Sequence, residues 1–220
     1  MQRVPEPELM SDEEQAVAYA NADFEEPHNH FIELLKESIG NELPESGKAV
    51  DLGCGTADIS IRFARAFPDY YIDAIDGSAA MLTEGKKAIY EAALEHRINL
   101  IEAYLQETSL AKQDYSVVIC NAMLHHLHDP MVLWQLIKTV SGHPPIFVMD
   151  LMRPESDEQV DDLVNEHARD EPEILQRDFR NSLKAAFTPD EVVLQLDVAG
   201  LNGLQVDVVS DRHLAISGRL

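Results

Sequence analysis

The sequence contains few cysteines, few basic residues and no long apolar run. Its two cysteines, Cys54 and Cys120, are too few for a disulfide framework, so we expect a protein of the reducing cytoplasm. No window approaches the roughly 18 consecutive apolar residues that a membrane-spanning helix requires. The acidic first residues form no basic-then-apolar leader, so we also expect no secretion signal.

Positive charge is scarce in particular. Lys and Arg together number 17, against 40 Asp and Glu, which gives a net charge of −23. The basic side chains are scattered, and the densest pair, Lys86 and Lys87, is isolated. A surface of this charge repels phosphate backbones and anionic lipids. We therefore expect no nucleic-acid partner and no membrane partner.

Apolar runs of strand length alternate with amphipathic helical stretches through the middle of the chain. This alternation is typical of β-α-β units, and so of a parallel sheet. Two of the runs, 117–119 and 146–148, are apolar throughout, as expected of strands that helices cover on both faces. The expected strands are 48–52, 70–76, 98–105, 115–121 and 145–151, with helices at 59–67, at 80–94 and after Asp129-Pro130, an N-cap and first-turn pair.

The segments before and after this centre favour helices. Residues 11–39 show the pattern of two helices, and Ser11 with Glu14 predicts a capping box for the first. Residues 153–187 are charged and carry no strand signal. Both segments are expected to cover the carboxyl edge of the sheet, where no other part of the chain would do so.

The last part of the chain predicts one more helix and a hairpin. Thr188 and Glu191 form a capping box with Pro between them, and Gly200 is expected to end the helix. The runs 204–210 and 213–219 predict two strands joined by a short turn.

A glycine turn follows the first expected strand. Residues 50–55, Val-Asp-Leu-Gly-Cys-Gly, run from the strand into Gly-x-Gly and then into a helix. Glycine tolerates positive φ and lets a ligand approach the backbone, and a helix N-terminus offers free N–H groups. Asp76 ends the second strand, 21 residues after Gly55, where an acid can accept hydrogen bonds from ribose hydroxyls. A purely structural turn, with a helix N-cap at Asp76 or Ser78, is the alternative.

Acidic residues beside this turn distinguish two classes of ligand. A dinucleotide site has a third glycine three residues after the second, but Asp58 occupies that position, and Asp51 lies two residues before the first glycine. These acids repel a pyrophosphate and suit a ligand with a cationic amino group and a cationic sulfonium. A nicotinamide-dependent dehydrogenase is therefore disfavoured.

Three motifs carry a family resemblance: DLGCGTAD at 51–58, YIDAIDGSAAML at 71–82 and YSVVICNAMLHHLHDP at 115–130. In this order they make residues 45–152 resemble the class I S-adenosylmethionine-dependent methyltransferases. The resemblance implies an α/β fold with a Rossmann-like seven-stranded sheet, mostly parallel with an antiparallel C-terminal strand, helices on both faces and a helical cap.

We expect a single domain built from four segments, with a homodimer through the cap left open. These are an N-terminal helical cap segment at 1–44, the cofactor-binding core at 45–152, a helical cap insertion at 153–187, and a C-terminal helix and hairpin at 188–220 that complete the core.

The resemblance also implies S-adenosylmethionine as cofactor and S-adenosylhomocysteine as product. The residues it carries over are Asp51, Gly53 and Gly55 for the methionine part, Asp76 for the ribose with Gly77 and Ser78 beside it, Met81 against the adenine, and Asn121 at the methionine end. The chain departs from the family at Ala57, where a third glycine is common, and at Ser116, where an acid is usual. Tyr104 replaces an acid near the adenine, so its ring or the Leu105 N–H would contact the base.

Candidate chemistry lies after the fourth strand, at His125, His126 and His128. Histidine has a suitable pKa for a general base, and His126 is our candidate for that role, with packing around Asp129-Pro130 as the alternative. We expect no metal, because adjacent residues on a tight turn rarely converge on one ion and the sequence offers no distant ligand.

Residues of the two cap segments are candidates for the acceptor pocket: Tyr19, His30, Arg153 and Arg180. Surface positions or ion pairs are the alternative for each, given the excess of acids. Trp134 lies among apolar helix positions, so we expect it in the core.

The function expected from the sequence is methyl transfer to a small-molecule acceptor by in-line displacement. A protein methyltransferase and a non-catalytic cofactor-binding or scaffold protein remain alternatives. Methylation of nucleic acid is disfavoured by the net charge of −23.

Overall fold

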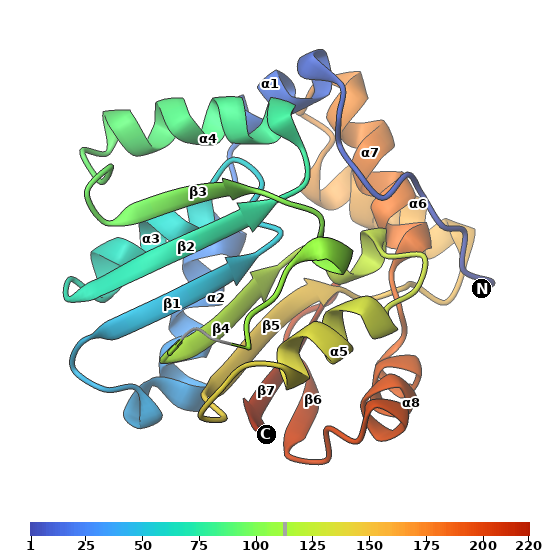
Figure 1. Cartoon of the computed structure of the whole chain (residues 1–220). Coiled ribbons are helices and arrows are strands. Elements are labelled where there is room, and N and C mark those ends of the chain that lie inside the picture. The colour runs from blue at the N-terminus through green and yellow to red at the C-terminus, as the bar shows by residue number, and fades with distance from the viewer. Residues whose placement is uncertain (112–113) are drawn as a thin grey trace.

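A seven-stranded sheet with the strand order β3-β2-β1-β4-β5-β7-β6 forms the centre of the molecule (Figure 1). The computed structural model describes residues 1–111 and 114–220. Its strands are β1 Gly47–Leu52, β2 Tyr70–Asp76, β3 Ile98–Glu102, β4 Val117–Asn121, β5 Pro145–Leu151, β6 Leu204–Val208 and β7 His213–Arg219. The first five pair in parallel, and β7 pairs antiparallel with β5 and β6. The predicted fold class is confirmed.

Helices cover both faces of the sheet, and two apolar clusters result. One face carries α2 Glu25–Ile39, α3 Asp58–Ala66 and α4 Ala79–Glu91, and the other carries α5 Met131–Lys138 and α8 Pro189–Ala199. Successive strand residues point to opposite faces. Val117 and Ile119 therefore join the first cluster, while Val118 joins the second, which explains an apolar run without alternation.

The helix caps lie where the sequence predicts them, except that two N-caps are shifted by one residue. Thr188 and Glu191 form the predicted capping box, and Gly200 ends α8 with a φ of 71°. The helix α1, Glu13–Asn21, is capped by Asp12, whose side chain accepts a hydrogen bond from the Gln15 N–H. The predicted box at Ser11 is therefore wrong, because a carboxylate one residue later fills the capping position. Likewise α5 starts one residue later than expected, with Pro130 at its N-cap.

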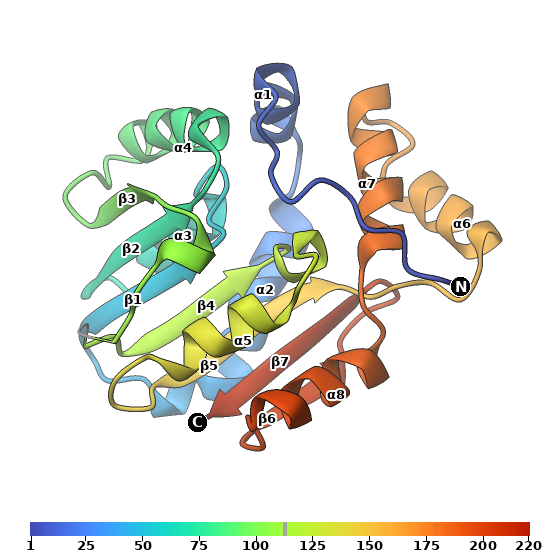
Figure 2. The same cartoon turned by 45° about the vertical axis from the view of Figure 1, so that its right-hand side comes forward.

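The predicted cap forms above the carboxyl ends of the strands (Figure 2). It contains α1 with α6 Asp157–His167 and α7 Glu173–Ala185, while short 3-10 turns lie at Gly40–Glu42, Leu105–Glu107 and Leu124–His126. The expected strand at 98–105 is shorter in the structure and ends at Glu102, and the chain enters the 3-10 turn at Leu105–Glu107. No helix formed by residues 1–111 or 114–220 is long and apolar enough to cross a membrane.

The helix α2 belongs to the core, not to the cap in which the segment 1–44 was expected to lie. Phe31 and Leu35 are fully buried in the cluster on the sheet face, and the Phe31 ring meets the Phe147 ring of β5 edge-on, with centroids 4.9 Å apart. The apolar face of the amphipathic helix α2 is thus buried against the sheet. Only the first part of the expected segment lies above the carboxyl edge.

Replacement of Phe31 by Ala tests this placement. Removing a fully buried ring leaves a cavity, so Phe31→Ala should lower the free energy of unfolding in urea by about 3–5 kcal/mol. The exposed Tyr90→Ala serves as the control and should change it by less than about 0.5 kcal/mol. Equal effects of the two substitutions would show that α2 does not pack on the sheet in solution.

Candidate functional site

A cavity of about 770 Å³ lies between the carboxyl ends of the strands and the cap. It lies at the point where the strand order reverses, because β1 is flanked by β2 on one side and β4 on the other. Open α/β sheets bind ligands in the crevice at this position. The volume lies within the range of small-molecule sites, about 300–1,000 Å³.

The glycine turn after β1 forms the floor of the cavity. Gly53 has a φ of +75° and Gly55 a φ of +52°, the left-handed region in which a side chain is strained. A Cβ atom on Gly53 would also lie 2.3 Å from the Met123 side chain. Ala57 adopts the same left-handed region with a φ of 62°, at the N-cap of α3. The backbone shape is therefore kept even where the third glycine is absent, at a cost of about 1 kcal/mol.

Asp76 joins this turn to the next one. Its Oδ2 accepts a hydrogen bond from the Gly55 N–H at 2.8 Å, and its Oδ1 accepts one from the Ser78 N–H at 2.7 Å. Burial raises the pKa of Asp76, although both hydrogen bonds favour its charged form. Asp76 thus holds two loops together while it faces the cavity.

Asp51 is the second buried acid of the floor. It is 1% exposed and accepts a hydrogen bond from the Ser60 hydroxyl at 2.6 Å. Burial raises its pKa to about 7, and the nearby Asp76 adds to that rise. A positive charge nearby would stabilise the ionised forms of these two carboxyl groups, whose pKa values are raised. The floor therefore suits a cationic ligand.

The other predicted cofactor residues also line the cavity: Gly77, Ser78, Met81, Tyr104, Leu105 and Asn121. Ser78 caps α4 by accepting from the Met81 N–H, and its hydroxyl donates to the carbonyl of Met10 at 2.7 Å. Tyr104 is half-exposed at the rim. The structure brings the expected set together, and its contacts with a cofactor remain a prediction.

Of the four acceptor-pocket candidates, Tyr19 lies in the cavity. It packs against Phe24 with ring centroids 4.6 Å apart, and burial raises its pKa to about 12. His30 lies outside the described lining, whereas His28 lines the cavity and bonds to Asp58 at 2.6 Å. Two residues along a helix point about 200° apart, which explains why His28 and not His30 is in the described lining.

The two candidate arginines also lie outside the described cavity lining. Arg153 is buried but turns away from the described cavity lining to pair with Glu191 at 2.6 Å, and it also donates to the carbonyl of Ala186. Arg180 forms an ion pair with Asp161, between α6 and α7. With many acids available, both guanidinium groups are used to hold the cap in place.

His125, one of the candidate histidines, pairs with a buried carboxylate, Asp150, which the sequence did not single out. Nδ1 of His125 lies 2.5 Å from Oδ1 of Asp150, and both side chains are at most 3% exposed. Burial would lower the pKa of His125, but the Asp150 carboxylate outweighs it and raises the pKa. The sequence feature that could have identified Asp150 is an acidic residue at the end of an otherwise apolar strand.

His126 was the candidate general base, and its surroundings argue against that role. Burial, with the neighbouring His125, lowers the pKa of His126 to about 3. A catalytic base works best with a pKa near the operating pH. The lowered pKa does not favour the general-base role of His126, which stays a prediction.

Residues 1–12, which we call the strap, run from beside α7 to α1 (Figure 2), and Glu8, Leu9 and Met10 of the strap line the cavity. Arg3 donates to the carbonyls of Ala185, His125 and Leu127, and its guanidinium stacks on the Phe187 ring at 3.9 Å. The strap thus links the two sides of the cavity and narrows its entrance.

Substitution of Arg3 tests whether these contacts hold the strap. Arg3→Ala removes three hydrogen bonds and a cation–π contact, so cleavage at strap glutamates by a Glu-specific protease should become several-fold faster. Arg169→Ala, at an exposed ion pair on the cap, is the control and should not change the rate. An unchanged rate in Arg3→Ala would mean that other contacts hold the strap.

Comparison with known proteins gives a consistent picture. Residues 49–141 match the family model described as a methyltransferase domain. The chain is 30% identical over 103 residues to malonyl-acyl-carrier-protein O-methyltransferase of Halalkalibacterium halodurans, covering 46% of this chain and 38% of that protein. It is 33% identical over 107 residues to trans-aconitate 2-methyltransferase of Mycobacterium tuberculosis, covering 47% and 36%.

A solved structure extends the likeness to nearly the whole fold. The plantazolicin methyltransferase BpumL, in complex with a monoazolic desmethylPZN analog and SAH, matches with a TM-score of 0.71 and 13% identity, covering 94% of this chain and 89% of that one. At that identity the likeness concerns the fold. The sequence matches, by contrast, span little more than a third of the curated relatives' lengths.

Proposed function

We propose that the chain is a class I S-adenosylmethionine-dependent methyltransferase and transfers the cofactor's methyl group to a small-molecule acceptor in the cavity, which the methyltransferase-domain match at residues 49–141 supports. The observation that best supports this proposal is the set of residues that form the floor of this cavity. There the Gly53–Gly55 turn, Asp51 and Asp76 lie together at the strand-order reversal.

The acids of the floor match the charges of the cofactor. In the proposal, Asp76 accepts from the ribose hydroxyls and Asp51 attracts the cationic amino group. The positive φ angles of the turn let the cofactor's methionine part approach the backbone. Met81 is buried at the cavity wall, in a position to pack on the adenine.

Methyl transfer from a sulfonium is an in-line displacement in which the leaving group is already part of the cofactor. Alignment and exclusion of water therefore supply most of the rate. The strap, α1 and α7 close the cavity above the floor, which serves both needs. No covalent intermediate with the enzyme is required.

A cavity with acidic residues in its lining and a volume typical of small-molecule sites favours a small acceptor over a macromolecular one. The net charge of −23 repels nucleic acid. The trans-aconitate relative acts, by its name, on a small molecule. Methylation of a protein remains the alternative, and a screen of small acceptors against basic proteins separates the two.

Substitution of Asp76 tests cofactor binding. Asp76→Ala removes the proposed ribose acceptor, so calorimetric titration should show binding of S-adenosylhomocysteine at least tenfold weaker, about 1.4 kcal/mol. Glu102→Gln is the matched control, because Glu102 ends the neighbouring strand opposite Asp76 but lies outside the described cavity lining. Absence of binding to the wild type would contradict the proposed function.

The raised pKa of Asp51 predicts a pH dependence. Without ligand, the carboxyl holds a proton below about pH 7, and the cationic amino group of the cofactor should bind its ionised form. Binding should therefore release a proton below pH 7, and affinity should fall about tenfold between about pH 7.5 and about pH 6. Titrations in buffers of different ionisation enthalpy measure the release. Asp51→Asn should abolish the part of the proton release that comes from Asp51. An unchanged proton release in this variant would exclude Asp51 as the titrating group.

A further inference from the structure

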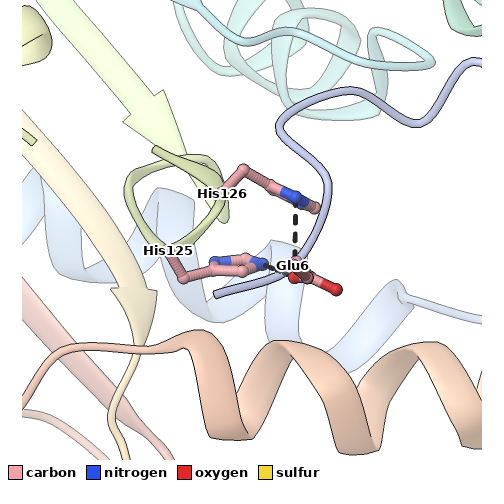
Figure 3. Close-up of side chains that lie close together, drawn as sticks. All are labelled: Glu6, His125 and His126. Carbon is pink, nitrogen blue, oxygen red and sulfur yellow. Dashed lines mark ion pairs between the residues drawn. The ribbon is translucent and has the colours of Figure 1, made fainter. Parts of the chain in front are cut away.

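Three side chains from distant parts of the chain converge beside the cavity, and two of them, His125 and His126, line it (Figure 3). Glu6 comes from the strap, while His125 and His126 come from the 3-10 turn after β4. Oε1 of Glu6 lies 3.5 Å from Nε2 of His125 and 3.5 Å from Nδ1 of His126. In Figure 3 both imidazole rings point toward the Glu6 carboxylate. One ligand atom from each residue lies within 4.8 Å of the other two.

The spacing of these atoms is unlike that of a hydrogen-bonded cluster. Direct hydrogen bonds between nitrogen and oxygen have lengths of about 2.7–3.2 Å, shorter than both contacts to Glu6. Ligands bound at about 2.1 Å around a tetrahedral ion, in contrast, lie about 3.4 Å apart. The observed distances match the second arrangement.

Neighbouring groups orient the three side chains. Oδ1 of Asp150 lies 2.5 Å from Nδ1 of His125, so a proton shared there leaves Nε2 free to donate its lone pair toward Glu6. The Ser182 hydroxyl donates to Oε1 of Glu6 at 2.9 Å. Carboxylate partners behind a ligating histidine are typical of metal sites. The remaining polar contact of His126 Nδ1 is a long one, 3.4 Å to the carbonyl oxygen of Pro7.

We propose that Glu6, His125 and His126 bind one divalent first-row transition-metal ion. Two imidazoles and one carboxylate are the donor set of zinc and non-haem iron sites that keep open positions. Here the open positions would face the cavity. A hydroxyl or carboxylate oxygen of the acceptor fits such a position, a step that rests on the proposed methyl transfer, whereas metal binding itself does not.

This inference replaces the expectation that no metal binds. That expectation held that the adjacent histidines have no distant ligand, and the strap supplies one in Glu6. The side chains of Glu6, His125 and His126 are 11%, 3% and 15% exposed, so water competes little for their donor atoms. Metal binding would also fasten the strap to the loop after β4.

A second group of similar residues is a weaker candidate. Glu166, His167 and Asp211 also lie within reach of one another. Nε2 of His167, however, is 2.7 Å from Asp211 and 3.0 Å from the Arg212 guanidinium. A permanent cation at the donor atom repels a metal ion, so this group serves as a control.

The test is calorimetric titration of Zn²⁺ into the full chain, with Co²⁺ absorption spectra as a second readout. Excess Mg²⁺ is added to occupy sites made only of carboxylates, so that the Zn²⁺ signal reports sites with imidazole ligands. We expect one ion per chain and visible Co²⁺ bands of a site with imidazole ligands. Glu6→Gln and His126→Ala should each weaken binding at least tenfold. His96→Ala, at an exposed histidine outside the described cavity lining, and His167→Ala should bind as the wild type does.

Several results would overturn the proposal. The first is that the wild type does not bind Zn²⁺ stoichiometrically. The second is that Glu6→Gln and His126→Ala both bind Zn²⁺ as the wild type does. The third is that only His167→Ala loses binding. Circular dichroism and S-adenosylhomocysteine binding confirm that each variant is folded. Zinc binding by a wild type that does not bind S-adenosylhomocysteine would uphold the metal site and count against the proposed methyl transfer alone.

Discussion

The geometry of the cavity depends on the hydrogen bonds that Asp76 accepts from two backbone N–H groups. The parallel register of β1 with β2 places Leu52 beside Ile75, so the turn after β1 arrives next to the carboxylate that ends β2. Asp76 then fixes Gly55 on one side and Ser78, the N-cap of α4, on the other. One side chain thus holds both loops in the shape that a nucleoside requires.

The upper half of the cavity is held together differently, by charged side chains that bridge helices and loops. Arg3, Arg153 and Arg180 donate to carbonyls or pair with acids, and each links cap elements to one another or to the core. The chain has 40 acids against 17 basic residues, so acidic partners outnumber the basic side chains. The scarce positive charge is therefore used for structure, while the cavity floor stays acidic. That division favours a cationic cofactor.

Predictions from the sequence succeeded where the determining interactions are local or periodic. The strand and helix pattern follows from alternation along the chain, and the glycine turn and Asp76 follow from short motifs. The structure leaves His30, Arg153 and Arg180 outside the described cavity lining, because helical phase and ion-pair choice depend on what packs opposite each side chain. The helix α2 could not be told from a cap helix, since an apolar face does not reveal whether a sheet or a cap covers it.

The sequence by itself determined the sheet, its helices, the turn that forms the cavity floor and the acids that give the floor its charge. Tertiary structure alone decided which residues enclose the upper cavity. Asp150 meets His125 because β5 lies beside β4, and Glu6 meets both histidines because the strap crosses from α7 to α1. Such encounters join residues more than twenty, and even more than a hundred, positions apart. They depend on the packing of whole elements, which no local pattern in the chain encodes.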